Sequence, residues 1–268
     1  MSIPTPPISE FTIGPFTIHF YALCVLSGAM LACLVGVLRS RKLHALAPNT
    51  KMAPGVIWDA LLVILPCGVI GARLYYVLTL PGFYLNHPQS IFKIWQGGLG
   101  IMGGIIFGVV AAWAFCRVRK IDFNHFLWCV VPGIPLAQSV GRLGNWFNAE
   151  LYGKETDLPW KLDISRGQYQ AVTFYHPTFL YEMLWNLIVF SVLLVIFRKT
   201  LFESKVVIPA YLALYTFGRV FIETLRIDNS EYILGVRVNI WFAITLLVVS
   251  AVWLIFEAKR VNPKPSKQ

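Results

Sequence analysis

The segment Gly141–Gly153 places polar side chains that could bind a ligand inside an otherwise apolar chain. It holds Arg142, Asn145, Asn148 and Glu150 between glycines. A guanidinium, two amides and a carboxylate together offer donors and acceptors suited to a phosphorylated head group, and glycines let backbone approach a ligand closely. The segment therefore predicts a binding site for a phosphate-bearing group.

A second group of polar residues recurs at helical spacing further along the chain. Tyr215, Arg219 and Glu223 follow one another at intervals of four residues, and Arg226 comes three residues later. At about 100° per residue these side chains form one stripe on a helix. Two interpretations remain open: Arg219 and Glu223 form an ion pair that only locks helices together, or the stripe lines a site with Arg142.

Single polar residues in other apolar segments extend this set. Glu182 follows His176-Pro177 and needs a cationic partner in an apolar setting. The candidate partners are Arg73, Arg142 and Arg219. For Arg73, snorkelling to the membrane surface is an alternative, and His176 and Tyr21 could be ordinary interfacial residues.

The composition requires membrane-spanning helices to position these residues. Hydrophobic residues make up 57% of the 268 positions, charged residues make up 13%, and the mean hydropathy is +0.64. A helix crosses the hydrocarbon core with about 20 apolar residues. We expect an all-α integral membrane protein, a single domain over residues 1–268 that forms a seven-transmembrane helix bundle. The expected spans lie near residues 18–38, 55–80, 97–116, 122–140, 176–197, 206–225 and 237–256.

The distribution of basic residues predicts the orientation in the membrane. The net charge is +10, but the Lys and Arg residues flank the spans, so we expect the lipid bilayer and not nucleic acid as partner. With the N-terminus outside, roughly twice as many basic residues fall on the inner side as on the outer side. We therefore expect an outer N-terminus, a cytoplasmic C-terminus and a site toward the outer face.

The longest gap between spans, residues 141–175, predicts a small outer-side cap between spans four and five. Its polar stretches of alternating character are typical of short strands and turns. The five cysteines all lie within or at the edge of apolar spans without paired spacing. We interpret them as small core residues and expect no disulfide, no metal and no cofactor.

The segment Gly141–Gly153 closely resembles the signature of the prolipoprotein diacylglyceryl transferases, integral membrane enzymes that lipidate bacterial lipoprotein precursors. Further matching motifs occur in the family's order and spacing from the first span to the sixth. They are His19-Phe20-Tyr21-Ala22, Gly71-Ala72-Arg73-Leu74, Gly97-Gly98-Leu99 with Gly103-Gly104, His176-Pro177-Thr178 with Tyr181-Glu182, and the run from Tyr215 to Glu223.

This resemblance implies a transferase of the bacterial plasma membrane, where it carries out the first step of lipoprotein maturation. The diacylglyceryl group of phosphatidylglycerol would pass to the thiol of the lipobox cysteine of a prolipoprotein, forming a thioether and releasing glycerol phosphate. The family's pattern makes Arg142 and Arg219 the essential catalytic pair. Around the lipid head group it places Arg142, Tyr21, Asn145, Glu150, Gly153, Tyr215 and Glu223. We assign supporting positions to Arg73, His176 and Glu182.

One position departs from the family's pattern. Several members carry a histidine between the paired glycines that has been proposed as a catalytic base, whereas this chain has Met102. Methionine cannot accept a proton, so either another residue serves or the reaction needs no strong protein base. A free thiol has a pKa of about 8.5 and is partly thiolate near neutrality, and nearby guanidinium groups would lower that pKa further.

Two other classes of function predict different features. A transporter or channel for an anionic solute also places arginines and glycines within the membrane, but it predicts corresponding broken helices in two repeats, and no internal repeat is evident. A structural lipid-binding membrane protein would share the composition. It would not convert phosphatidylglycerol in the presence of a lipobox peptide.

Overall fold

The computed structural model describes residues 2–14, 16–47, 50–94, 97–164, 173–197 and 205–261. The chain divides into two compact units. The larger unit consists of Met1–Gly36 and Leu127–Gln268, and the smaller unit consists of Val37–Phe126. All of the polar residues at the centre of the candidate site belong to the larger unit.

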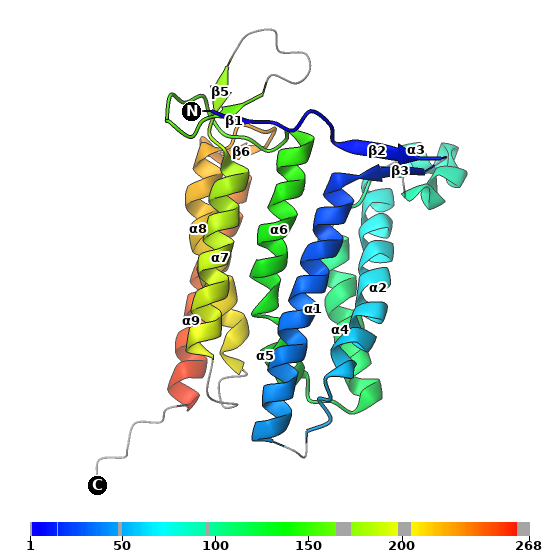
Figure 1. Cartoon of the computed structure of the whole chain (residues 1–268), viewed down its shortest axis with the longest axis vertical. Helices are drawn as coiled ribbons and strands as arrows, with labels where there is room; N and C mark the ends of the chain where they lie inside the picture. Colours follow the sequence, from blue (N-terminus) through cyan, green and yellow to red (C-terminus); the bar gives the residue numbers. More distant parts are fainter. Residues whose placement is uncertain are drawn as a thin grey trace. The chain divides into compact units, whose positions relative to one another are not determined.

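Long apolar helices dominate the described residues (Figure 1). Five of them are long and apolar enough to cross a membrane. These helices are α1 (Phe20–Leu46), α2 (Gly55–Thr79), α4 (Ile101–Arg119), α7 (Thr178–Ile196) and α9 (Val238–Val261). A sixth span results if the bent pair α5 (Phe123–Val130) and α6 (Gly133–Asn148) crosses as one. The helical membrane architecture is therefore confirmed, with five or six candidate spans among the described residues where seven are expected.

Helix α8 (Val207–Leu225) coincides with the expected sixth span but is not among these candidates. Arg219 and Glu223 lower the mean hydropathy of a helix of only 19 residues. Both charged side chains have partners within the protein, as described below. The stripe predicted from their spacing thus lies on a helix whose polar face meets other helices.

The expected fourth span, residues 122–140, coincides with a bent pair of helices. The helix is interrupted at Val131 and Pro132, and the axes of α5 and α6 differ by 43°. Proline breaks a helix because it has no N–H to donate and clashes with the preceding turn. Helix α6 then continues to Asn148, so the expected loop does not begin at residue 141. It ends at Ala149, whose φ of 52° is the left-handed conformation common at helix C-termini.

One glycine of the signature, Gly144, allows α6 to pack closely against α1. A Cβ atom added to Gly144 would lie 2.6 Å from the Tyr21 ring of α1. The two helices therefore approach closely at this turn. The polar residues Arg142 and Asn145 occupy other positions of the same helix, which directs them at α7 and at the segment that follows α6.

Short strands connect the helices of the larger unit. β1 (Ile3–Pro4), β4 (Leu162–Asp163) and β5 (Phe174–Tyr175) form one sheet, in which β1 runs parallel and β5 antiparallel to β4. Two antiparallel hairpins are formed by β2 (Glu10–Ile13) with β3 (Phe16–His19) and by β6 (Tyr232–Ile233) with β7 (Val236–Arg237). Short strands thus occur in the region 141–175 as expected, and its residues 165–172 lie outside the described chain.

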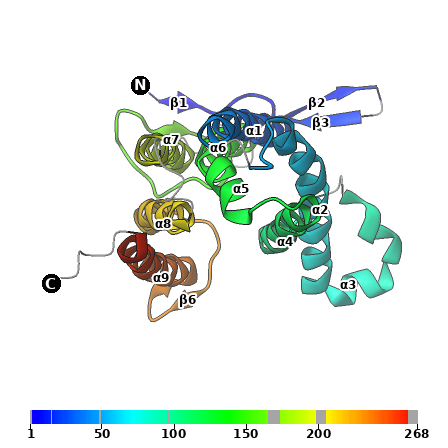
Figure 2. The same cartoon turned by 90° about the horizontal axis from the view of Figure 1, so that it is seen from below.

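In the smaller unit, α2 and α4 pack against each other at glycines, and α3 (Pro81–Asn86) and the 3-10 helix η1 (Pro88–Phe92) follow α2. A Cβ atom on Gly103 would lie 2.1 Å from the carbonyl oxygen of Gly71, so neither position has room for a side chain. In the larger unit, α7, α8 and α9 lie side by side (Figures 1 and 2). Their shared interface is filled by Val189, Leu193 and Val207 and their neighbours.

Candidate functional site

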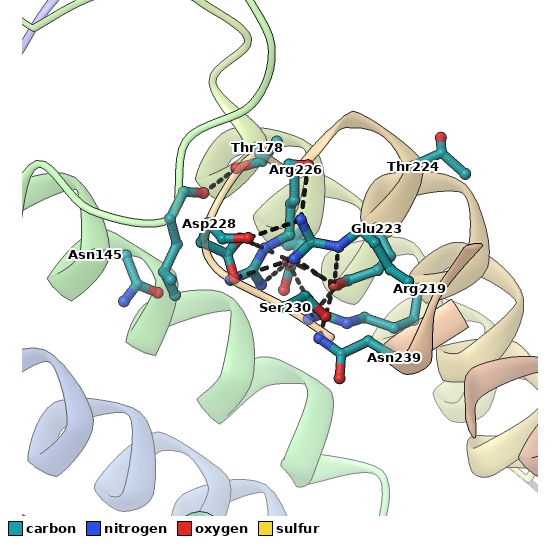
Figure 3. A network of polar contacts seen from close by, with 12 residues as sticks. Asn145, Thr178, Arg219, Glu223, Thr224, Arg226, Asp228, Ser230 and Asn239 are labelled. Carbon is teal, nitrogen blue, oxygen red and sulfur yellow. Dashed lines mark hydrogen bonds and ion pairs between the residues drawn. The ribbon is translucent and has the colours of Figure 1, made fainter. Parts of the chain in front are cut away.

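Polar residues from four helices meet at one end of the larger unit. Because consecutive helices run in opposite directions, the C-terminal ends of α6 and α8 lie beside the N-terminal ends of α7 and α9. Each end contributes charged or amide side chains. Figure 3 shows the part of this network that surrounds Arg219, Glu223 and Asp228.

Glu182 of α7 connects three arginines. Its carboxylate pairs with Arg142 of α6 through one oxygen and with Arg219 of α8 through the other. Arg226 Nη1 lies 3.7 Å from the same oxygen as Arg219. The side chain of Glu182 is only 5% exposed. The cationic partner expected for Glu182 is therefore supplied by two of the three candidate arginines.

Glu223 of α8 is fully buried and pairs with Arg219 of the same helix. Arg219 Nη2 lies 2.6 Å from Glu223 Oε2. The other oxygen, Oε1, accepts hydrogen bonds from Asn239 Nδ2 at 2.9 Å and Arg237 Nε at 3.2 Å. The ion pair of the alternative interpretation is present, but it belongs to a network that reaches α6, α7 and α9.

The arginines fall into two groups, those with N–H donors left free for a ligand and those whose donors are all used within the protein. A guanidinium has five N–H donors. Arg142 donates to Asn145 Oδ1 at 3.1 Å and forms an ion pair with Glu182, and Arg219 donates to Glu182 and forms an ion pair with Glu223. Within the described residues, three donors on each of Arg142 and Arg219 have no acceptor. These two side chains, 21% and 19% exposed, can bind a ligand without losing a protein contact.

Arg73 has no N–H donor left for a ligand. Its Nε and Nη atoms donate to the backbone carbonyl groups of Ser90, Ile91, Lys93, Gly97 and Gly98, at 2.5 to 3.4 Å. The residue is 6% exposed, so the interpretation that it snorkels to the membrane surface is wrong. The buried guanidinium thus supplies donors to five carbonyl groups of η1 and of the segment that follows it. All five of its donors are used within the smaller unit.

A chain of amides extends the network along the signature. Asn145 Nδ2 donates to Glu150 Oε1 at 2.9 Å, and Asn148 Nδ2 donates to the same oxygen at 3.2 Å. Asn145 is 5% exposed. Because Asn145 also accepts from Arg142, the carboxylate of Glu150 acts on the guanidinium of Arg142 through one intervening amide.

Gly153 and Thr178 join the end of the signature to α7 and α8. The Gly153 N–H donates to the His176 carbonyl at 2.9 Å, and a Cβ atom on Gly153 would lie 3.0 Å from the Leu225 carbonyl oxygen. The Thr178 hydroxyl donates to the carbonyl of Leu151. The backbone segments therefore approach too closely for a larger residue at position 153 to fit without a shift.

The remaining predicted residues lie at the border of the network. His176 Nδ1 is 3.1 Å from the Tyr181 hydroxyl, which also accepts from Trp160 at 3.0 Å. Tyr21 is 41% exposed and packs on Gly144. Tyr215 lines a small cavity together with Glu182, Asn186 and Arg219. This cavity has room for about one water molecule.

Three residues of the network were not identified from the sequence: Asp228, Arg237 and Asn239. They lie beyond α8, in the connection to α9 and at its start. Partial burial alone would raise the pKa of Asp228, but the hydrogen bond from Arg226 at 2.7 Å and the charges of Arg226 and Arg237 outweigh it and lower that pKa below its ordinary value. The only signal in the sequence is the pairing of Arg226 with Asp228 two residues later.

The chain is similar over most of its length to known proteins of one family. A sequence model described as "Prolipoprotein diacylglyceryl transferase" matches residues 9–256. The chain belongs to this family. Proteins named phosphatidylglycerol–prolipoprotein diacylglyceryl transferase are 41% identical in Bifidobacterium adolescentis, over 94% of this chain and 79% of the relative, and 41% identical in Frankia alni, over 100% and 70%. One from Streptomyces griseus is 40% identical over 96% of this chain and 78% of the relative.

Proposed function

We propose that this chain, as a phosphatidylglycerol–prolipoprotein diacylglyceryl transferase, binds the lipid phosphate between Arg142 and Arg219. The observation that carries this assignment is the set of N–H donors on these two arginines that have no acceptor among the described residues. Planar guanidinium forks fit the oxygens of a phosphate. Glu182, which contacts both, holds the two forks together.

The two arginines with free donors can hold an anionic ligand. Four arginines, Arg142, Arg219, Arg226 and Arg237, are paired with three carboxylates, Glu182, Glu223 and Asp228. The fourth carboxylate of the network, Glu150, reaches Arg142 only through Asn145. The phosphodiester of phosphatidylglycerol carries one negative charge, which the free donors of Arg142 and Arg219 can hydrogen-bond directly.

In the transfer reaction, negative charge develops on the phosphate that is bound by the same two arginines. The sulfur of the lipobox cysteine forms a bond to the terminal glyceryl carbon of the diacylglycerol. The bond from that carbon to the phosphate oxygen breaks, glycerol phosphate leaves, and the thiol proton is released. The leaving phosphate gains negative charge in the transition state, and hydrogen bonds from guanidinium groups strengthen as it does. Arg142 and Arg219 therefore stabilise the leaving group.

We further propose seven spans, with α5 and α6 together as the fourth and α8 as the sixth, an outer N-terminus and an outer site. Cysteine labelling from outside the cell is then expected to reach a probe that replaces Lys161 but not one that replaces Arg119 until the membrane is opened. Lys161 lies beside β4, and Arg119 is 55% exposed at the end of α4. The reverse accessibility would contradict the orientation.

Met102, the second residue of α4, is proposed to have no part in proton transfer. Met102→Leu keeps a similar apolar volume and is expected to change turnover by less than about twofold. Met102→His is expected to gain little, because a base assists least where the thiol is already ionised. Activity should rise with pH toward the lowered pKa of the substrate thiol. An inactive native enzyme that Met102→His strongly activates would contradict this proposal.

The function itself is tested with purified protein in detergent. Phosphatidylglycerol and a peptide with a lipobox cysteine are expected to give a peptide heavier by one diacylglyceryl group and free glycerol phosphate. The matched control is the same peptide with serine in place of the cysteine, which should give neither product. Binding of the lipid without conversion would favour a structural lipid-binding protein, and passage of an anion across vesicles without conversion would favour a transporter.

A further inference from the structure

The β6–β7 hairpin carries a buried arginine to which the proposed mechanism gives no role. Arg237 is the last residue of β7 and is 4% exposed. A charge withdrawn from water in this way is costly unless it is paired and hydrogen-bonded. The partners of Arg237 therefore indicate its role.

All five N–H donors of Arg237 are directed at acceptors of the protein. Nη1 donates to the backbone carbonyls of Arg226 and Asp228, at 2.9 Å each. Nη2 donates to Asp228 Oδ2 at 3.2 Å and lies 3.0 Å from Glu223 Oε1, to which Nε also donates at 3.2 Å. Arg237 thus has no donor left for a phosphate, unlike Arg142 and Arg219.

The two oxygens of Glu223 have different partners. Oε1 is held by Arg237 and by Asn239 Nδ2 at 2.9 Å, while Oε2 lies 2.6 Å from Arg219 Nη2. The carboxylate can turn about its last bond unless one oxygen is fixed. Arg237 and Asn239 fix Oε1 from the hairpin and from α9, and this directs Oε2 at Arg219.

We propose that Arg237 and Asn239 are positioning residues for the transfer reaction, which act through Glu223 on the orientation of Arg219. The proposal rests on the proposed function, because Arg219 is its point of action. A misdirected Arg219 would stabilise the leaving phosphate less well, while the peptide would still bind. Loss of Arg237 should therefore lower kcat and leave the KM for the peptide unchanged.

The first experiment measures kcat and KM for four variants, each corrected for the folded fraction by gel filtration. Arg237→Gln is expected to lower kcat by more than about tenfold with the peptide KM within twofold. Arg237→Lys keeps the charge and should recover part of that loss. Arg119→Gln removes an exposed arginine paired with Asp59 at 3.0 Å and should match the native enzyme. If Arg237→Gln does not fold, the proposal is tested with Arg237→Lys and Asn239→Ala instead. A kcat within twofold of the native value in both of these variants would overturn the proposal.

The second experiment tests whether the effect passes through Glu223. In a Glu223→Gln background, adding Arg237→Gln is expected to lower the single-turnover rate by less than about threefold, because the carboxylate through which Arg237 acts is already gone. The same loss in both backgrounds would overturn the proposal and leave Arg237 a purely structural residue. Failure of the native protein to convert phosphatidylglycerol would instead contradict the proposed function, so the two outcomes are distinguishable.

Discussion

Replacement of Arg142 or Arg219 by lysine is expected to lower turnover by more than about tenfold although the charge is kept. Each arginine holds Glu182 through one N–H and retains three donors in a planar fork for the phosphate. A lysine ammonium has three donors around a single nitrogen and cannot both keep the carboxylate contact and span two phosphate oxygens. The measurement is kcat/KM for phosphatidylglycerol in detergent.

The matched control for these variants is Arg119→Lys. Arg119 forms an exposed ion pair with Asp59, and exposed pairs contribute little to stability. This control should retain native turnover and show that an arginine-to-lysine change is not harmful in itself. Near-native turnover of both Arg142→Lys and Arg219→Lys would remove the phosphate-binding role from the account.

Glu182→Gln is expected to have the second large effect, on stability and on activity together. Glu182 is the carboxylate that Arg142, Arg219 and Arg226 share, and its side chain is 5% exposed. Removal of one partner from a buried ion pair costs about 3–5 kcal/mol, because the remaining charges stay buried and unpaired. Since both phosphate-binding arginines lose their common contact, we expect turnover to fall by about 100-fold.

The stability effect is measured by thermal unfolding in detergent and the activity by turnover at a temperature where the variant remains folded. The control is Glu257→Gln, a glutamate of α9 whose partner Arg260 lies 3.8 Å away and is 64% exposed. Glu257→Gln should change neither quantity appreciably. A Glu182→Gln variant that unfolds at the native temperature and turns over normally would show that Glu182 does not organise the site.

The sequence predicts much of this site because its residues are confined to an apolar setting. Arg219 and Glu223 stand at helical spacing in an apolar run, and Glu182 needs a cationic partner there, so pairing with an arginine follows from the cost of an isolated charge. The structure supplies that partner twice, in Arg142 and Arg219. Their placement follows from the alternating directions of α6, α7 and α8, which bring the C-terminal ends of α6 and α8 beside the N-terminal end of α7.

Other features depend on contacts between residues far apart in the sequence. Arg73 and Arg237 have the same side chain as Arg142 and Arg219, and only the acceptors around them show that their donors are used within the protein. The close approach of α6 to α1 at Gly144 likewise depends on Tyr21, more than a hundred residues earlier, which packs where a side chain at Gly144 would be. Composition alone favours a loop at such a glycine-rich polar segment.

The most direct test of the central claim is an experimental structure of the protein with phosphatidylglycerol bound. We expect the phosphate to lie between Arg142 and Arg219, with its oxygens about 2.7–2.9 Å from nitrogen atoms of both guanidinium groups. Both arginines should keep their contacts to Glu182. A phosphate bound elsewhere, with the free donors of Arg142 and Arg219 directed away from it, would contradict the account.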